Sequence, residues 1–308
     1  MHMPDDWYPE LLKTYTDEDG QSVYVSFRPL PPGRDFGPEE LQDQETPIRN
    51  IGVWCSGGAD STSAIYLIAR TIKELGLDVQ VIPHTFRHYV KPWNAAVAQR
   101  VINELRKLPE CEGAIGEHVF VDLGDTSQKE LHSLAFKNFN LTKISAGEID
   151  YFYGATTLNP PPEAGAVAIS EDRAKDRDAD QNTHSENNKN NVTPVMSLYK
   201  LVDKRFTAWV YKEFALENII PLTRSCELTF DQTAHFQENC YSLGDVMRDS
   251  LPWFQKNYRD YHCWWCQERD WAFSRYGLDG RAWIPTEHMT QRGFVCPVFN
   301  CKPIHDNL

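Results

Sequence analysis

The stretch with the clearest potential for chemistry is SGGADSTS at residues 56–63, which combines two glycines, one aspartate and four hydroxyl side chains. Glycines let backbone N–H groups turn toward a ligand, and a helix that begins there adds unpaired amides and the positive end of its dipole. Ser56, Ser61, Thr62 and Ser63 offer hydroxyl donors. Asp60 would repel a bare phosphate unless it holds Mg²⁺ or caps the helix. The stretch therefore predicts a site for a metal-bound nucleotide.

The same stretch differs from two other phosphate-binding loops. No lysine follows the glycines, as it does in G-x-x-x-x-G-K-[ST], and the third glycine of the dinucleotide fingerprint is missing. The alternative is a tight turn with a good N-cap and no ligand. The position after an apolar run and before a helical pattern favours phosphate binding.

A second candidate site is formed by cysteines toward the C-terminal end. Two thiolates separated by two residues can bind one ion, and tetrahedral zinc takes four ligands. A redox pair would open a helix in a thioredoxin-like unit, which these flanks do not resemble. We therefore expect a zinc site with the ligands Cys226, Cys240, Cys263 and Cys266, where His262 or His235 is the alternative to Cys240. Of the other cysteines, we expect buried apolar roles for two and a weaker metal pair from two: Cys55 and Cys111, and Cys296 and Cys301.

The elements that must position these residues alternate between strand and helix. The run IGVWC at 51–55 lacks polar alternation, which is typical of a strand buried on both faces. Further strands are expected around 79–82, 118–125 and 150–158, and helices at 64–75, 93–108, 129–139 and 198–218. This order predicts an α/β fold with a Rossmann-like open parallel sheet, whose ligands bind at the carboxyl ends of its strands.

The domain organisation follows from changes in composition along the chain. Residues 1–46 are expected to be an N-terminal extension with a short strand at 22–27 and a Pro/Gly linker. Residues 47–222 form the nucleotide-binding α/β domain, in which 159–191 is a mobile polar loop. Residues 223–308 form a helical, aromatic-rich region that binds zinc.

Composition limits the partners and the compartment. The 308 residues are 41% hydrophobic and carry a formal net charge of −13, without a Lys/Arg cluster, which disfavours nucleic acid as the main partner. No long apolar run indicates a membrane span and MHMPDDWYPE is no signal peptide, so we expect a cytoplasmic protein. In that compartment eight cysteines indicate metal binding or reactivity before disulfides.

The pattern S-G-G-x-D-S/T resembles the PP-loop of the N-type ATP pyrophosphatases. This family includes GMP synthetase, NAD synthetase, asparagine synthetase, tRNA thiolases and 7-cyano-7-deazaguanine synthase. Its members cleave ATP between the α and β phosphates, place AMP on a substrate oxygen and let a nucleophile displace it. The resemblance implies an adenine nucleotide alpha hydrolase-like fold with ATP and Mg²⁺ as cofactors. It implies that Asp60 helps hold Mg²⁺ and that the leaving pyrophosphate is held by Ser56, Gly57, Gly58, Ser61 and Thr62.

Downstream motifs are similar to those of the 7-cyano-7-deazaguanine synthase branch. These are C-x-x-C-x-E-R-x-x-A-F at 263–273, TRSC at 223–226, TPVMSLYK at 193–200 and Arg87-His88 after the second strand. The resemblance implies zinc on the cysteines, Lys200 and Arg87 as cations for the phosphates, and His88 nearby. It also implies that backbone groups at Thr85 and Phe86 contact adenine. The alternative for Lys200 and Arg87 is solvated surface charge, and for His88 a satisfied loop histidine.

Two of that branch's segments are missing, F-V-P-x-R-N and Y-P-D-C-R, and both are expected around the deazapurine. The first hypothesis is thus an ATP-dependent enzyme that turns a carboxylate, 7-carboxy-7-deazaguanine or a similar acid, into an amide or nitrile with ammonia. The second is a repurposed enzyme of an antiviral or DNA-modification system that couples the activated acid to an amine, such as one on a protein partner. A tRNA thiolase and a non-catalytic nucleotide-binding subunit are further alternatives, and the resemblance implies a homodimer.

Overall fold

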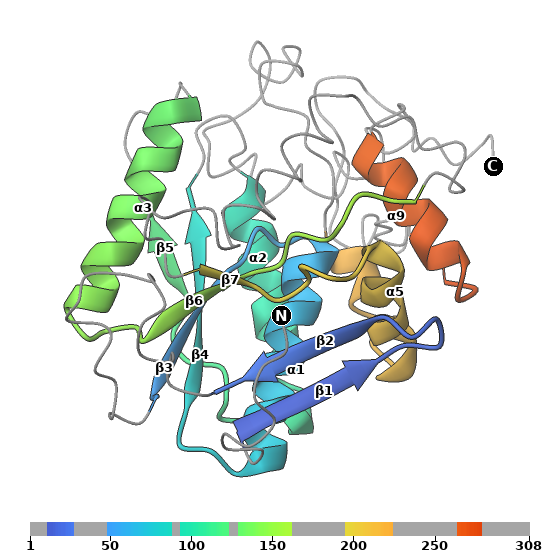
Figure 1. The fold of residues 1–308 in the computed structure, drawn as a ribbon, viewed down its shortest axis with the longest axis horizontal. Coiled ribbons are helices and arrows are strands. Elements are labelled where there is room, and N and C mark those ends of the chain that lie inside the picture. The colour runs from blue at the N-terminus through green and yellow to red at the C-terminus, as the bar shows by residue number, and fades with distance from the viewer. Residues whose placement is uncertain are drawn as a thin grey trace, which may run out of the picture.

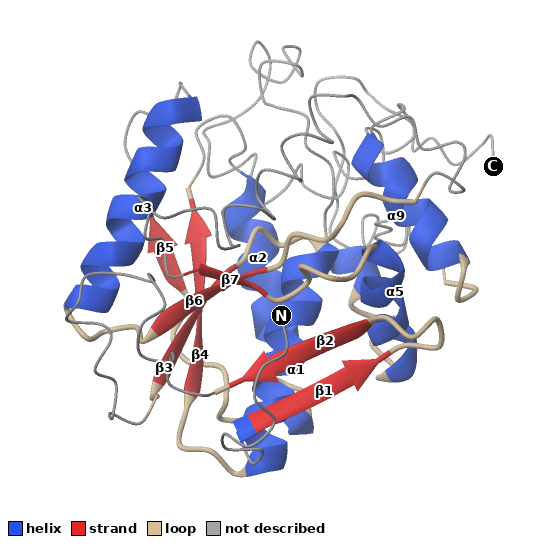
Figure 2. Ribbon diagram, in the orientation of Figure 1, coloured by secondary structure: helices blue, strands red, loops and turns tan. Residues whose placement is uncertain are grey.

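The computed structural model describes residues 11–27, 48–87, 93–122, 129–161, 195–223 and 264–278. Within these ranges the chain forms a five-stranded sheet flanked by helices and a separate two-stranded hairpin (Figure 1, Figure 2). In this part of the chain no helix combines the length and the apolar character that a bilayer crossing needs.

The five-stranded sheet is parallel throughout. Its strands are β3 (Asn50–Trp54), β4 (Gln80–Phe86), β5 (Val119–Val121), β6 (Tyr151–Gly154) and β7 (Val195–Ser197). They lie in the order β5-β4-β3-β6-β7, so the chain starts at the centre, builds outward to β5 and returns to the other side of β3 as β6. This is a Rossmann-like, doubly wound sheet. Its topological switch point, where such sheets bind ligands, lies between the carboxyl ends of β3 and β6.

Helices cover both faces of this sheet. The larger ones are α1 (Ala59–Leu75), α2 (Trp93–Leu105), α3 (Lys129–Ser145), α5 (Lys204–Glu213) and α9 (Trp264–Ser274). Because parallel crossovers are right-handed, connections that run in opposite directions across the sheet place their helices on opposite faces. Figure 1 accordingly shows α3 on one side of the sheet and α1, α2 and α5 on the other. Two short 3₁₀ helices are η3 (Pro109–Cys111) and η5 (Ile220–Leu222), and α9 packs against α5.

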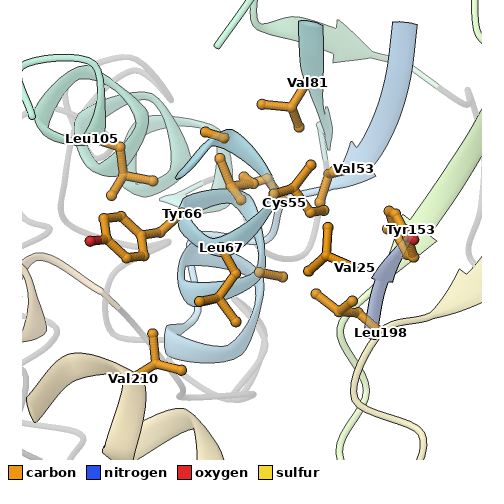
Figure 3. Packing of buried hydrophobic residues seen from close by; sticks show 14 of the residues in the cluster. Val25, Val53, Cys55, Tyr66, Leu67, Val81, Leu105, Tyr153, Leu198 and Val210 are labelled. Carbon is orange, nitrogen blue, oxygen red and sulfur yellow. The ribbon is translucent and has the colours of Figure 1, made fainter. Parts of the chain in front are cut away.

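The main core surrounds α1. Tyr66 and Leu67 of this helix are fully buried, and Figure 3 shows them between side chains of the sheet and of two neighbouring helices. Leu105 comes from α2 and Val210 from α5, and both are also fully buried. Because α1 is enclosed by neighbours, the position of its first turn is fixed relative to β3 and α5.

An aromatic layer fills the opposite face of the sheet. Trp54, the last residue of β3, stacks on Phe86 of β4 with a centroid distance of 4.1 Å and on Phe152 of β6 at 5.5 Å. Phe136 and Phe139 of α3 pack on the same indole ring. This layer holds the carboxyl ends of the central strands together beneath α3.

The N-terminal hairpin consists of β1 (Leu12–Thr16) and β2 (Ser22–Ser26) in antiparallel pairing. Its far end is tied to the main sheet because the hydroxyls of Tyr151 and Tyr153 donate to the Ser26 carbonyl at 2.6 and 3.1 Å. The expected strand at 22–27 is therefore confirmed as β2. Its partner β1 has no equivalent in the sequence expectations.

The expected order of strands and helices is otherwise confirmed, but strand β7 was not expected and several bounds differ. Helix α1 begins at Ala59, strand β4 continues to Phe86, helix α3 continues to Ser145, and strand β6 ends at Gly154. The helix expected at 198–218 begins only at Lys204, because β7 and a turn occupy the preceding residues and Asp203 caps the helix by accepting from Arg205 N. The helix expected at 93–108 ends at Leu105. The polar loop expected at 159–191 lies mostly outside the described residues.

Candidate nucleotide-binding site

The loop between β3 and α1 is held by backbone contacts that require glycine. Gly57 has a φ of 75°, and a Cβ atom there would lie 2.6 Å from Val97 Cγ1 and 2.8 Å from the Ala98 nitrogen of α2. The loop therefore packs so closely against α2 that a residue with a Cβ atom does not fit at position 57. At its start, Cys55 N donates to the His84 carbonyl of β4 at 2.8 Å. These contacts fix the loop at the carboxyl end of the central strand.

Helix α1 begins without a side-chain cap. Its N-cap is Gly58, in an extended conformation, and the hydroxyls of Ser61 and Thr62 donate inward to the Gly58 carbonyl at 3.2 and 2.8 Å. Ser56 is exposed, and its Oγ accepts from Gly58 N at 3.4 Å. Asp60 makes no capping bond, so the expectation that Asp60 caps the helix is wrong. A helix start with this geometry beside the switch point suits an anionic group.

Asp60 lies at the centre of a charge cluster that sequence reasoning did not find. Its Oδ2 accepts from Lys204 Nζ at 2.6 Å, and its Oδ1 accepts from the Thr207 hydroxyl at 2.8 Å. Lys204 is the first residue of α5, and its side chain is only 2% exposed, against 22% for Asp60. Glu268 of α9, fully buried, places its Oε2 3.5 Å from the same ammonium. The cluster, defined as Asp60, Lys204, Thr207 and Glu268, joins three helices at the base of the loop.

The cluster leaves Asp60 able to bind a divalent cation. A carboxylate offers about four lone-pair sites, and Lys204 and Thr207 use two of them. Mg²⁺ in nucleotide sites is commonly held by one or two carboxylates together with substrate phosphates and water. Asp60 is partly exposed at the first turn of α1 and so fits the role of one such carboxylate.

A second hydrogen-bond chain supports the loop from β4. The Thr85 hydroxyl donates to the Cys55 carbonyl at 2.6 Å, and its oxygen lies 2.8 Å from His118 Nε2. Because the single hydroxyl proton goes to Cys55, Nε2–H of His118 is the donor in the second bond. Burial lowers the pKa of His118 to about 4, and burial likewise lowers the pKa of His84 to about 4. The Thr85 side chain therefore fixes the loop, which leaves backbone groups as the expected contacts for adenine.

Acidification is expected to destabilise the fold through these two histidines. Their ordinary pKa is 6.5, and a lower value in the folded state means that the unfolded chain binds more protons below pH 6.5. Stability is therefore present above pH 6.5 and is lost as the pH falls toward 4, by about 2 kcal/mol for each histidine between pH 7 and 5. Urea unfolding at the two pH values measures this loss. The variant His118→Gln should remove roughly half of it, and an unchanged pH dependence in this variant would contradict the assignment.

Three other residues expected at the site, Phe86, Arg87 and Lys200, lie at or after the carboxyl ends of strands of the sheet. Arg87 is exposed, with its guanidinium 5.2 Å from the centre of the Phe120 ring, and Phe86 stacks on Trp54. Lys200 is half-buried in the turn after β7, where its N–H donates to the Ser197 carbonyl. His88 lies outside the described residues. The roles given to Arg87, Phe86 and Lys200 stay predictions.

Most of the expected zinc ligands fall outside the described part of the chain. These are Cys226, Cys240 and Cys263, together with His235 and His262, and Cys266 lies in α9 with its side chain not described. Within the described ranges no three His, Cys, Asp or Glu side chains gather as a metal site. Cys55 and Cys111 are buried free thiols as expected, and burial raises their pKa to about 11 and about 12.

The second half of the C-x-x-C-x-E-R-x-x-A-F motif has a structural explanation in the described residues. Arg269 of α9 donates to the carbonyls of Ile220 and Thr223 at 2.7 and 3.3 Å. Ala272 and Phe273 are fully buried in the main core. Thr223 is the first residue of TRSC, so these bonds place the beginning of that segment beside the helix that carries Cys266.

Comparisons with known proteins add little to this description. No family model matches the chain, and a search of curated proteins finds no match. Among solved structures, the chain is similar to the U34-tRNA thiolase NcsA from Methanococcus maripaludis with its [4Fe-4S] cluster. The two are 12% identical, the match covers 81% of this chain and 78% of the other, and the TM-score is 0.38. A likeness at that score carries no argument about function. The chain's own strand order makes it a Rossmann-like α/β protein with a doubly wound parallel sheet.

Proposed function

We propose that this chain is an ATP-dependent enzyme of the PP-loop type that transfers AMP to a substrate oxygen and releases pyrophosphate. The observation that carries the proposal is the SGGADST loop at the carboxyl end of β3, beside the switch point, with a glycine N-cap and Asp60 bonded to a buried lysine. This geometry supports binding of a metal-bound polyphosphate, because amides, a cation and a partly exposed carboxylate converge at one helix start.

The residues of the loop fit a reaction at the α phosphate. A carboxylate oxygen of the substrate attacks the α phosphorus, the bond to the bridging oxygen breaks, and pyrophosphate leaves. In this proposal the amides of Gly57 and Gly58 hold the pyrophosphate, and Lys204 supplies a positive charge near Asp60. Mg²⁺ bound at Asp60 would supply further charge neutralisation for the phosphates. The protein's contribution is then orientation and electrostatic stabilisation.

For the second half-reaction we propose ammonia as the nucleophile and 7-carboxy-7-deazaguanine, or a similar acid, as the substrate. The support is the set of downstream motifs shared with 7-cyano-7-deazaguanine synthase, of which α9 carries the E-R-x-x-A-F part in a defined structural role. Ammonia attacks the carbonyl carbon of the acyl adenylate, AMP leaves, and a proton is lost to give the amide. A second adenylation on the amide oxygen leads to the nitrile. The cysteines would hold a structural zinc ion.

The test is the identification of nucleotide products by mass spectrometry. Purified protein is incubated with ATP, Mg²⁺ and 7-carboxy-7-deazaguanine, with and without ammonium. We expect AMP and pyrophosphate only when the acid is present, and an amide or nitrile only with ammonium. Asp60→Asn should lower AMP formation at least about 100-fold, whereas Asp78→Asn, an exposed aspartate beyond the end of α1, should have no effect.

Other outcomes of this experiment would change the proposal. AMP without a small-molecule amide would favour coupling to an amine on another molecule, such as a protein. Bound iron in place of zinc would favour sulfur transfer to tRNA. ADP as the product, or no nucleotide turnover with any carboxylate, would overturn the proposed adenylation chemistry.

A further inference from the structure

Glu268 is a second buried carboxylate beside the Lys204 ammonium. It is fully buried in α9, with its Oε2 3.5 Å from Lys204 Nζ, while the same ammonium bonds Asp60 Oδ2 at 2.6 Å. The same ammonium is therefore shared by two carboxylates. Because taking a carboxylate out of water costs several kcal/mol, a lysine that needed only a partner would be served by Asp60 alone.

The two carboxylates compete for one cation. Asp60 approaches Lys204 from α1 and Glu268 approaches it from α9, and charge interactions are strong where water is largely excluded. Each carboxylate therefore weakens the hold of the ammonium on the other. Only Asp60 is partly exposed, so only Asp60 can exchange part of its bond to Lys204 for a bond to a cation from solvent.

Glu268 is held in place independently of Asp60. The next residue, Arg269, donates to the carbonyls of Ile220 and Thr223, and α9 packs on α5, the helix that begins with Lys204. The helix that carries Glu268 is therefore held by contacts that do not involve Asp60. The Glu268 carboxylate meets the ammonium from α9, whereas Asp60 meets it from α1.

We propose that Glu268 is a positioning residue for the nucleotide loop: by sharing the Lys204 ammonium, it frees Asp60 to bind the Mg²⁺ of MgATP and keeps the ammonium beside the phosphates. The inference rests on the proposed function, because it concerns the same loop and the same nucleotide. It gives α9 a part in ATP use that is separate from any metal held by the cysteines.

The test measures binding of α,β-methylene-ATP, which cannot be cleaved between the α and β phosphates, at increasing Mg²⁺ by calorimetry. In Glu268→Gln the ammonium turns fully to Asp60, so the Mg²⁺ concentration for half-maximal binding should rise at least about fivefold, with a lower kcat for AMP formation. Glu213→Gln removes an exposed carboxylate at the other end of α5 and should change this concentration less than twofold. A purely structural role would lower the melting temperature without changing the Mg²⁺ dependence.

A second variant covers the case in which Glu268→Gln does not fold. Glu268→Asp keeps the charge but withdraws it by one methylene, so the Mg²⁺ concentration for half-maximal binding should rise about twofold. If the wild-type protein binds the analogue and a folded variant shows an unchanged Mg²⁺ dependence, the inference about Glu268 is overturned but the proposed function is not. If the wild-type protein does not bind the analogue at any Mg²⁺ concentration, the proposed function fails and the inference fails with it.

Discussion

Lys204→Met is expected to lower kcat/KM for AMP formation at least about 100-fold, the usual effect of removing one group that stabilises developing charge. The ammonium is 2.6 Å from Asp60 Oδ2 and almost fully buried, so no water or neighbouring cation can replace it easily. Without it, the partly exposed Asp60 carboxylate at the first turn of α1 loses its neighbouring ammonium and repels polyphosphate. The measurement is steady-state AMP release, with analogue binding by calorimetry.

The difficulty with this variant is that it also removes one partner of a buried ion pair, which typically costs about 3–5 kcal/mol of stability. The double variant Lys204→Met, Glu268→Gln separates the two effects, because it removes the fully buried charge that the single variant leaves behind. We expect the double variant to regain most of the lost stability in urea unfolding but none of the lost activity. Lys212→Met, an exposed lysine on the same helix, is the matched control and should leave both unchanged. Activity that returns together with stability would show that Lys204 serves the fold and not the phosphates.

The part of the site formed by consecutive residues could be predicted from the sequence. A buried strand, two glycines and a helix ending at Gly76 are local signals, and the structure confirms each, including the left-handed conformation of Gly76. The parallel sheet followed from the order of such units. Strands β5 and β7 have only three residues, too few for a pattern, which is why β7 was missed and the limits of β5 were set too wide.

The part formed by distant residues could not be predicted. Asp60 and Lys204 are 144 residues apart, and the sequence analysis chose Lys200, which stands four positions before Lys204 in what looked like one helix. Because the turn after β7 delays the helix start to Lys204, only Lys204 begins α5 and reaches Asp60. In the sequence, Glu268 appeared only as part of the C-x-x-C-x-E-R-x-x-A-F motif. Its role in a buried charge cluster depends on the packing of three helices, which leaves no periodic pattern in the sequence.

Gly57→Ala is expected to abolish nucleotide binding while leaving a folded protein. A Cβ atom at this position would lie 2.6 Å from Val97 Cγ1 and 2.8 Å from the Ala98 backbone nitrogen, so the loop must move away from α2. That movement carries the amides of Gly57 and Gly58 away from the phosphates, and misplacing such groups by about 1 Å commonly costs about 100-fold in rate. Calorimetry with α,β-methylene-ATP and AMP release measure the loss.

Gly113→Ala is the matched control for Gly57→Ala, because both glycines have a φ of 75° and nothing lies within 4 Å of a Cβ at Gly113. Both variants incur the cost of a left-handed backbone, roughly 1–2 kcal/mol for a residue with a Cβ. Only Gly57→Ala adds a steric conflict, which we expect to cost about 1–3 kcal/mol more in urea unfolding. Normal nucleotide binding in Gly57→Ala would mean that the loop does not hold the phosphates, whereas a similar loss of binding in Gly113→Ala would mean that backbone strain alone accounts for the effect. Loss of binding in Gly57→Ala with normal binding in Gly113→Ala therefore assigns the effect to the loop itself and not to a general loss of stability.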